Sequence, residues 1–244
     1  MPMRDISPRD PATRLFCWML AVCVAASAGA SGQTVRPVIS ELGNPGKGRV
    51  EYLNDSDTPL NVVLSVQSFT VDEEGGLAYR ALDPNIRVKL SSTSFRIQPH
   101  DSFFVFYEAQ ADSPPAWFVI YADFSGFAFR TQQGMNVRLQ LPHTVYLLPK
   151  QSLEKSDVHL TRAWFEPQSR TVVLEVDNSG DYFGRAIQTV ILSSKKKEEG
   201  PGFPIFPRSK RRIEVPLQGM GTPDTVMVEF EHFKLEEKLA VSSP

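Results

Sequence analysis

Cysteine is almost missing from this sequence. Its 244 residues include two cysteines, Cys17 and Cys23, and both lie within the first thirty positions. If that segment is removed on export, the remaining chain has no disulfide, no thiolate metal site and no cysteine nucleophile. The rest of the chain must then fold on its apolar core and its hydrogen bonds alone.

Neither sign of charge predominates. The formal net charge is -2 at pH 7, and removal of residues 1–30, which carry three arginines and two aspartates, changes it to -3. This balance gives no electrostatic reason to expect nucleic acid or an anionic membrane as a partner. The one dense charge run, 195–200, joins three lysines to two glutamates and a glycine, and it predicts a solvated loop.

The motifs of catalysis and cofactor binding are also lacking. The sequence contains no Gly-x-Ser-x-Gly elbow, no phosphate-binding glycine loop and no dinucleotide fingerprint. Four histidines, His100, His143, His159 and His232, stand at least sixteen residues apart and form no metal-ligand motif. We therefore expect no enzyme, no cofactor and no metal.

What the N-terminus contains is the pattern of a secretory signal peptide. Three arginines precede an apolar run at 15–26, and small residues follow it. The run is too short for a comfortable membrane span, so we expect cleavage after Ala28 or Ala30 and a soluble exported protein. Lipidation at Cys23 is disfavoured, because Val22 stands where Gly, Ala or Ser is normal.

The composition favours strands and turns over helices. The chain has nineteen prolines, fifteen glycines and sixteen phenylalanines among runs rich in Val, Leu and Tyr. Its length suits two domains of about 100 residues. We expect an all-β protein with a signal peptide at 1–30, an N-terminal domain at 31–150, a polar linker at 151–156 and a C-terminal domain at 157–244.

Alternating patterns between turn residues locate the strands. About seven strands before the linker match the spacing of an immunoglobulin-like sandwich, and the pattern restarts after it. The predicted strands are 38–42, 49–53, 60–69, 86–90, 94–97, 102–108, 117–124 and 135–148, then 158–165, 170–176, 185–192, 211–217 and 225–235.

Two of these segments resemble each other. Residues 49–57 and 170–181 both run from an arginine through an alternating strand into a turn with Asn and Ser that ends in Asp. We interpret this as a weak internal repeat. Two similar sandwiches in tandem would explain it.

The stretch 134–150 has the strictest alternation. Met135, Val137, Leu139 and Leu141 share one face, and polar residues occupy the other. Any half-buried strand alternates in this way, so this apolar ridge either packs into the core of its own domain or contacts a partner.

Four segments, in this order, give the chain a family resemblance. Gly-Arg-Val-Glu-Tyr-Leu-Asn-Asp-Ser-Asp-Thr-Pro (48–59), Phe-Arg-Ile-Gln-Pro-His-Asp (95–101) and Trp-Phe-Val-Ile-Tyr-Ala (117–122) look like the N-terminal domain of the PapD-like periplasmic pilus-assembly chaperones. Gly-Phe-Pro-Ile-Phe-Pro-Arg-Ser-Lys-Arg-Arg-Ile (202–213) is similar to their hydrophobic-then-Leu-Pro-Gly-Ser-x-Arg segment, with Pro207-Arg208 in place of Pro-Gly. The resemblance covers nearly the whole mature chain.

The resemblance implies a fold and a function. It implies two immunoglobulin-like sandwiches in a periplasmic protein that lends the last strand of its first domain to a pilus, fimbrial or similar secreted subunit. Met135, Val137, Leu139 and Leu141 match the donor residues by position, and an outer-membrane usher is the further partner. It implies no nucleic acid and no small-molecule cofactor.

The resemblance also implies a carboxylate anchor, and there the sequence departs from the family. The family holds the subunit's C-terminal carboxylate with an arginine, matched by Arg36, and a lysine, whose position falls on Thr144. Thr144 offers one neutral hydrogen bond and no charge. Its neighbour His143 points to the opposite face, and Arg138 and Lys150 are the other cations nearby. The missing lysine supports an alternative, an exported structural or adhesive tandem-sandwich protein without strand exchange.

Overall fold

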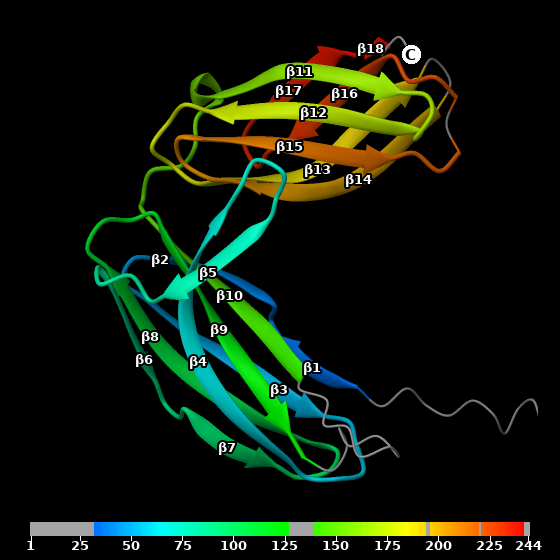
Figure 1. Cartoon of the computed structure of the whole chain (residues 1–244). Helices are drawn as coiled ribbons and strands as arrows, with labels where there is room; N and C mark the ends of the chain where they lie inside the picture. Colours follow the sequence, from blue (N-terminus) through cyan, green and yellow to red (C-terminus); the bar gives the residue numbers. More distant parts are fainter. Residues whose placement is uncertain (1–31, 127–138, 194–195, 220, 242–244) are drawn as a thin grey trace, which may run out of the picture.

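The computed structural model describes residues 32–126, 139–193, 196–219 and 221–241. Figure 1 shows two β-sandwiches, one built from the first half of the chain and one from the second. No helix in these residues is long and apolar enough to span a membrane. The expected all-β fold of two tandem immunoglobulin-like sandwiches is confirmed. The predicted signal peptide lies outside the described residues, and the domain boundaries stay predictions.

The first sandwich packs a four-stranded sheet on a six-stranded one. The smaller sheet has the order β1-β3-β8-β6, with strands β1 (Gln33–Arg36), β3 (Gly46–Asn54), β8 (Asp101–Ala111) and β6 (Ile86–Leu90). The larger has the order β2-β10-β9-β4-β5, and β7 also pairs with β4. Its strands are β2 (Ile39–Gly43), β10 (Leu139–Leu148), β9 (Ala116–Ser125), β4 (Leu60–Val71), β5 (Leu77–Ala81) and β7 (Ser94–Ile97).

The second sandwich consists of two four-stranded sheets. A short 3-10 helix, η2 (Lys155–Asp157), leads into it. One sheet has the order β15-β12-β11-β18 and the other β14-β13-β16-β17. The strands are β11 (Val158–Glu166), β12 (Thr171–Asn178), β13 (Gly184–Ser193), β14 (Lys196–Ile205), β15 (Ser209–Pro216), β16 (Thr225–Glu229), β17 (Lys234–Lys238) and β18 (Ala240–Val241).

Each sandwich has its own core, because alternate residues of its strands face inward. Val50 and Tyr52 of β3 meet Val105 of β8 in the first core, and all three are fully buried. Val172 and Leu174 of β12 occupy the second core in the same way. A third cluster joins residues of both halves and forms the junction described below.

Two predicted segments were wrong. The charge run 195–200 is not a loop, because residues from Lys196 onward belong to β14. Among the described residues β14 pairs only with β13, at the edge of its sheet. Charged side chains at such an edge stay in water and discourage pairing with other chains. The predicted strand 225–235 is two strands, β16 and β17, with Phe230 and Phe233 stacked 4.4 Å apart between their centroids at the turn.

Three short strands escaped prediction: β1, β5 and the two-residue β18. β1 has four residues and directly follows the expected signal peptide. β5 is exposed at all five positions, so no buried face imposes an apolar alternation on its sequence.

The sequence repeat corresponds to a repeated hydrogen-bonding device. Asn54 at the end of β3 and Asn178 at the end of β12 are both fully buried. The Nδ2 of Asn54 donates to the carbonyl oxygens of Thr58 at 2.9 Å and Gln98 at 3.0 Å. The Nδ2 of Asn178 donates in the same way to Tyr182 at 2.9 Å and to Phe206 at 3.0 Å. Each asparagine therefore ties its own turn to a distant one.

The buried asparagine side chains should contribute strongly to the stability of the fold. Replacing Asn54 with alanine leaves the buried carbonyl of Ile97 and the partly buried carbonyls of Thr58 and Gln98 without this donor. The Asn54→Ala variant should therefore lose about 2–3 kcal/mol of unfolding free energy. Urea unfolding measures this loss. Asn61→Ala, at an exposed position of β4, should stay within about 0.5 kcal/mol of the parent. Equal losses in both variants would contradict the assignment.

Candidate functional site

Strand β10 is paired differently along its two halves. Its second half, Thr144 to Leu148, pairs with β2 on one side and with β9 on the other. Its first half, Leu139 to His143, pairs with β9 alone among the described residues. One edge of the first half therefore has no strand partner among the described residues, and we call it the open edge.

The hydrogen bonds to β2 show which backbone groups face that open edge. The N–H of Thr144 donates to the carbonyl of Val38 at 2.8 Å, and the carbonyl of Leu148 accepts from the N–H of Asn44 at 3.1 Å. Backbone groups of alternate residues point to the same side of a strand. The N–H and C=O of Gln140 and the C=O of Pro142 therefore face the open edge. Pro142 has no N–H, which fits its edge position.

The described part of the predicted apolar ridge leans on its own domain. Leu139 and Leu141 are half-buried and pack against the core of the first sandwich. Met135 and Val137 lie outside the described residues. Leu139 and Leu141 thus combine packing in their own core with some remaining exposure.

His143 marks the boundary between the two halves of β10. It is fully buried, with its Nδ1 2.7 Å from the carbonyl oxygen of Pro37 and its Nε2 2.9 Å from the hydroxyl of Tyr107. Burial lowers the pKa of His143, and the hydrogen bond to Pro37 opposes that shift in part. In the neutral ring Nδ1–H donates to Pro37 and Nε2 accepts from Tyr107. His143 faces the core and Thr144 faces away, as predicted.

The two expected anchor residues lie on strands of different sheets, Arg36 on β1 and Thr144 on β10, and their side chains have different surroundings. The Nη2 of Arg36 lies 3.2 Å from Oε2 of Glu51, and the Arg36 side chain is 58% exposed. Thr144 lines a cavity between the sandwiches. Of the other two cations, Arg138 is outside the described residues and Lys150 is exposed just beyond β10.

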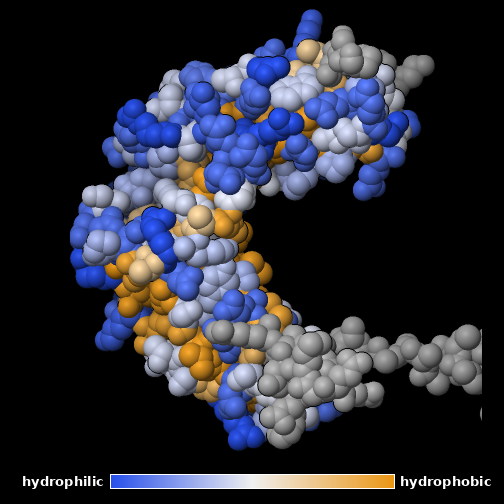
Figure 2. Space-filling view, viewed as in Figure 1, coloured by the Kyte–Doolittle hydropathy of each residue, from blue (hydrophilic) through white to orange (hydrophobic). Residues whose placement is uncertain are grey.

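An aromatic cluster joins the two sandwiches. The rings of Tyr146 and Phe183 stack with centroids 4.5 Å apart, and those of Trp117 and Phe206 meet edge to face at 4.8 Å. The indole N–H of Trp117 donates to the carbonyl of Phe69 at 2.8 Å. Figure 2 shows apolar surface where the two sandwiches meet, beside a wide cleft that opens between them.

Polar contacts hold the same junction. The Nε of Arg185 on β13 lies 2.6 Å from Oε1 of Glu41 on β2, and its guanidinium carbon is 5.4 Å from the ring centroid of Tyr146. The N–H of Arg212 donates to the carbonyl of Glu73 at 2.7 Å, so the β4–β5 turn is tied to β15. Ion pair, backbone bond and aromatic cluster together limit movement between the sandwiches.

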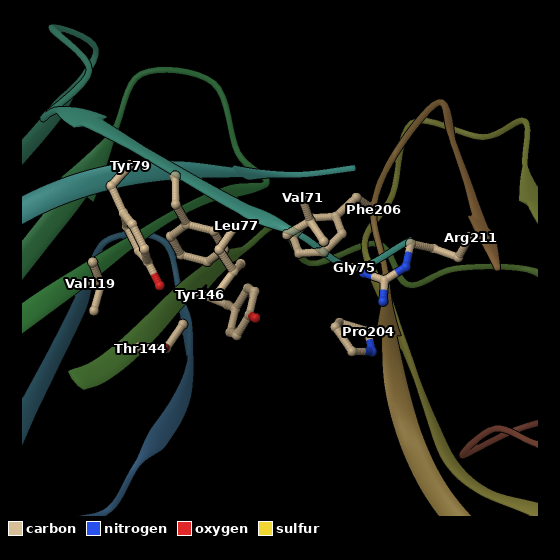
Figure 3. Close-up of a pocket in the computed structure, with 11 residues that line it drawn as sticks. Val71, Gly75, Leu77, Tyr79, Val119, Thr144, Tyr146, Pro204, Phe206 and Arg211 are labelled. Atoms are coloured by element: carbon tan, nitrogen blue, oxygen red, sulfur yellow. The ribbon is translucent and has the colours of Figure 1, made fainter. Parts of the chain in front are cut away.

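A cavity of about 200 Å³ opens beside this junction. Figure 3 shows Thr144 and Tyr146 of β10 on one side and Arg211 of β15 on the other. In the described part of the chain, no cluster of His, Cys, Asp and Glu side chains could hold a metal ion. The arrangement therefore offers an open strand edge and a junction cavity as its candidate binding features.

Sequence reasoning missed the junction residues. Tyr146 lies on β10, Phe183 just before β13, Phe206 just after β14 and Arg211 on β15. Alternation within one strand does not show which of these residues meet. One signal was present for Arg211: in β15 it shares the face of Ile213 and Val215, which turns inward.

No protein-family model matches the sequence, and no curated protein matches it. Solved structures do match. A chain of the CsuC–CsuE chaperone–tip adhesion subunit complex from the archaic Csu pili of Acinetobacter baumannii has a TM-score of 0.52 at 10% identity, over 87% of this chain and 100% of that chain. A chain of the chaperone–tip adhesin complex of CFA/I fimbriae has a TM-score of 0.51 at 10% identity, over 86% and 99%. The YadV chaperone has a TM-score of 0.51 at 12% identity, over 85% and 99%. These likenesses show a shared two-sandwich fold.

The buried histidine predicts a pH dependence of stability. The unfolded chain binds a proton at His143 near pH 6.5, whereas the folded chain does so only at lower pH. Stability should therefore fall as the pH drops below about 6.5, by up to about 1.4 kcal/mol per pH unit until the folded pKa is reached. Urea unfolding of the parent and of His143→Gln between pH 7.5 and 5 measures the two slopes.

The variant should show the shallower slope, because glutamine does not titrate. His159→Gln, at an exposed position, serves as the control and should keep the parental slope. A parental slope in His143→Gln would show that this ring is not the group responsible.

Proposed function

We propose that this chain is a periplasmic chaperone that binds and caps pilus, fimbrial or similar secreted subunits by lending them β10. The observation that carries the proposal is the edge of Leu139 to His143, which is paired on one side only among the described residues. Addition of a partner strand to such an edge is the mode of chaperone–pilin donor-strand complementation. The fold shared with the solved fimbrial chaperones supports it.

The donated strand contributes in two ways. Ladder hydrogen bonds from Gln140 and from the carbonyl of Pro142 set the register of the added strand. Apolar side chains fill the subunit's open core, at about 1.5–3 kcal/mol for each side chain taken fully out of water. Leu139 and Leu141 are already half-buried and have less to gain, so Met135 and Val137 should supply most of the apolar gain.

The anchor of the subunit is proposed at Arg36 and Thr144. The ion pair between Arg36 and Glu51 is largely exposed on the arginine side, and exposed pairs contribute little. Arg36 can therefore exchange Glu51 for a subunit's terminal carboxylate at small cost. Thr144 adds one neutral hydrogen bond, so this anchor should be weaker than a pair of cations.

The mechanism requires no reaction chemistry. The lent strand covers a subunit edge that would otherwise pair with other chains and aggregate. Release then depends on a replacement strand from the next subunit, delivered at an outer-membrane usher. No cofactor, metal or nucleotide enters this scheme.

A second function has its own support. Leu139 and Leu141 pack against the core of their own sandwich, and Arg36 already has a carboxylate partner. Both observations suit an exported structural or adhesive protein that keeps β10 for itself. The two functions differ in whether the open edge of β10 accepts a strand.

The backbone of Gln140 provides a sharp test. Gln140→Pro removes the N–H that faces the open edge and places a ring there, while the ladder to β9 uses the alternate residues and stays intact. Each variant would be co-expressed in the periplasm with a candidate pilus or fimbrial subunit, and captured subunit would be quantified. We expect the parent to co-purify with a subunit and Gln140→Pro to recover only background.

Gln140→Ala is the matched control, because it keeps the N–H and should capture subunit as the parent does. Val137→Arg tests the apolar ridge separately and should also lose capture. Equal capture by Gln140→Pro and Gln140→Ala would exclude strand addition at this edge. Absence of capture by the parent would favour the structural or adhesive alternative.

A further inference from the structure

An arginine lies almost buried at the junction of the two sandwiches. Arg211 is 9% exposed, whereas its neighbours Lys210 and Arg212 are exposed. The alternation of β15 turns Arg211 to the face of Ile213 and Val215, which pack in or against the second core. A cation therefore occupies an inward position of an otherwise apolar row.

The guanidinium group of Arg211 is incompletely satisfied. Its Nε has no hydrogen-bond partner among the described residues. The carboxylate of Asp72 acts on Arg211 through its charge, while its Oδ1 accepts the N–H of Gly76 at 2.6 Å. Burying a cation without a hydrogen-bonded carboxylate is unfavourable. Burial accordingly lowers the pKa of Arg211, and Asp72 and Tyr146 oppose the shift.

Arg211 lines a cavity, although its Nε is itself enclosed by protein. Figure 3 shows Arg211 and Tyr146 on opposite sides of the cavity of about 200 Å³, with Phe206, Val71 and Leu77 forming apolar walls. Gly75, at φ +93°, brings the β4–β5 turn close: a Cβ there would lie 3.0 Å from Nη2 of Arg211. None of the described residues that line the cavity is acidic.

We propose that this cavity binds a carboxylate carried on a small apolar body, with Arg211 as the cation that receives it. The planar guanidinium matches a carboxylate in geometry, and its terminal nitrogens supply N–H donors at the cavity. The hydroxyl of Tyr146 is the second donor, and the walls take the apolar body. A phosphate dianion fits less well, because a single cation in apolar surroundings leaves one of its charges uncompensated.

The site is distinct from the donated edge of β10, and it shares one residue with the proposed subunit anchor, because Thr144 also lines this cavity. Its cation comes from the second sandwich, and its geometry exists without a client. Two sources share the required chemistry: a free small acid, or the free C-terminus of a chain that lies in the cleft. Benzoate represents the first source and N-acetylphenylalanine the second.

The test is binding of benzoate to the full mature chain. Calorimetry and tryptophan fluorescence detect the binding, because the ring of Trp117 contacts Phe206 of the cavity wall. Benzamide has the same shape without the charge. Benzoate should bind at least about tenfold more tightly than benzamide, and Arg211→Met should weaken benzoate by at least about tenfold, as expected for loss of a charged hydrogen bond. Arg212→Met, at the exposed neighbouring position, should bind as the parent does.

A structural role for Arg211 predicts a different pattern. If the arginine only supported the junction, Arg211→Met would lower the melting temperature and leave no benzoate site to lose. In a binding role, methionine relieves an unpaired buried cation, so the melting temperature should be equal or higher. Tyr146→Phe keeps the ring stack on Phe183, so it should weaken the binding of benzoate without lowering the melting temperature. This variant gives a second test if Arg211→Met does not fold.

Absence of benzoate binding at millimolar concentration would overturn the proposal, as would equal affinity for benzoate and benzamide or unchanged binding in Arg211→Met. With binding established, the second probe identifies the source. Tighter binding of N-acetylphenylalanine than of benzoate indicates a chain terminus, and the reverse order indicates a free acid. Loss of capture in Gln140→Pro has no bearing on this result, so the two proposals fail separately.

Discussion

The hydrogen bonds of His143 to Pro37 and Tyr107 lie where β10 changes from a strand paired on both sides to one paired on a single side. Beyond His143, β2 completes the sheet. Before it, the backbone of Gln140 faces an open edge. The histidine holds the crossover from β1 to β2 against β10, so the length of the open edge depends on this buried neutral ring. An open edge is a liability in a stable protein unless it serves a purpose.

The same strand continues to the second sandwich. Tyr146 stacks on Phe183 and faces the cavity that Arg211 borders from the other side. β10 therefore combines an open edge at one end with the interdomain junction at the other. A partner strand added along the first half of β10 would run toward the junction between the sandwiches. The angle between the sandwiches would then affect which partner strands can fit there. Glu41 and Arg185 contribute to that angle with an ion pair.

Much of the fold could be predicted from local patterns. The strands at 86–90 and 94–97 have the predicted bounds, because turn residues frame a clear alternation. The exposed β5 and the charged edge strand β14 could not be predicted in this way. Most of their side chains face water, so no core imposes an apolar alternation on their sequences. Sequence alone identified Thr144 as a position without charge. It did not identify Arg211, because the residues around it, Asp72, Gly75 and Tyr146, are far from it in the sequence.

Amide hydrogen exchange at Gln140 tests the central claim, that the first half of β10 is an edge available to a partner strand. In the free protein the Gln140 amide should exchange fast, while the Thr144 amide, bonded to Val38, should be protected. On formation of a complex with a subunit, the Gln140 amide should become protected by at least about tenfold, and the Thr144 amide should change little. A Gln140 amide that is already protected in the free protein, or that is unaffected by a bound subunit, would contradict the account.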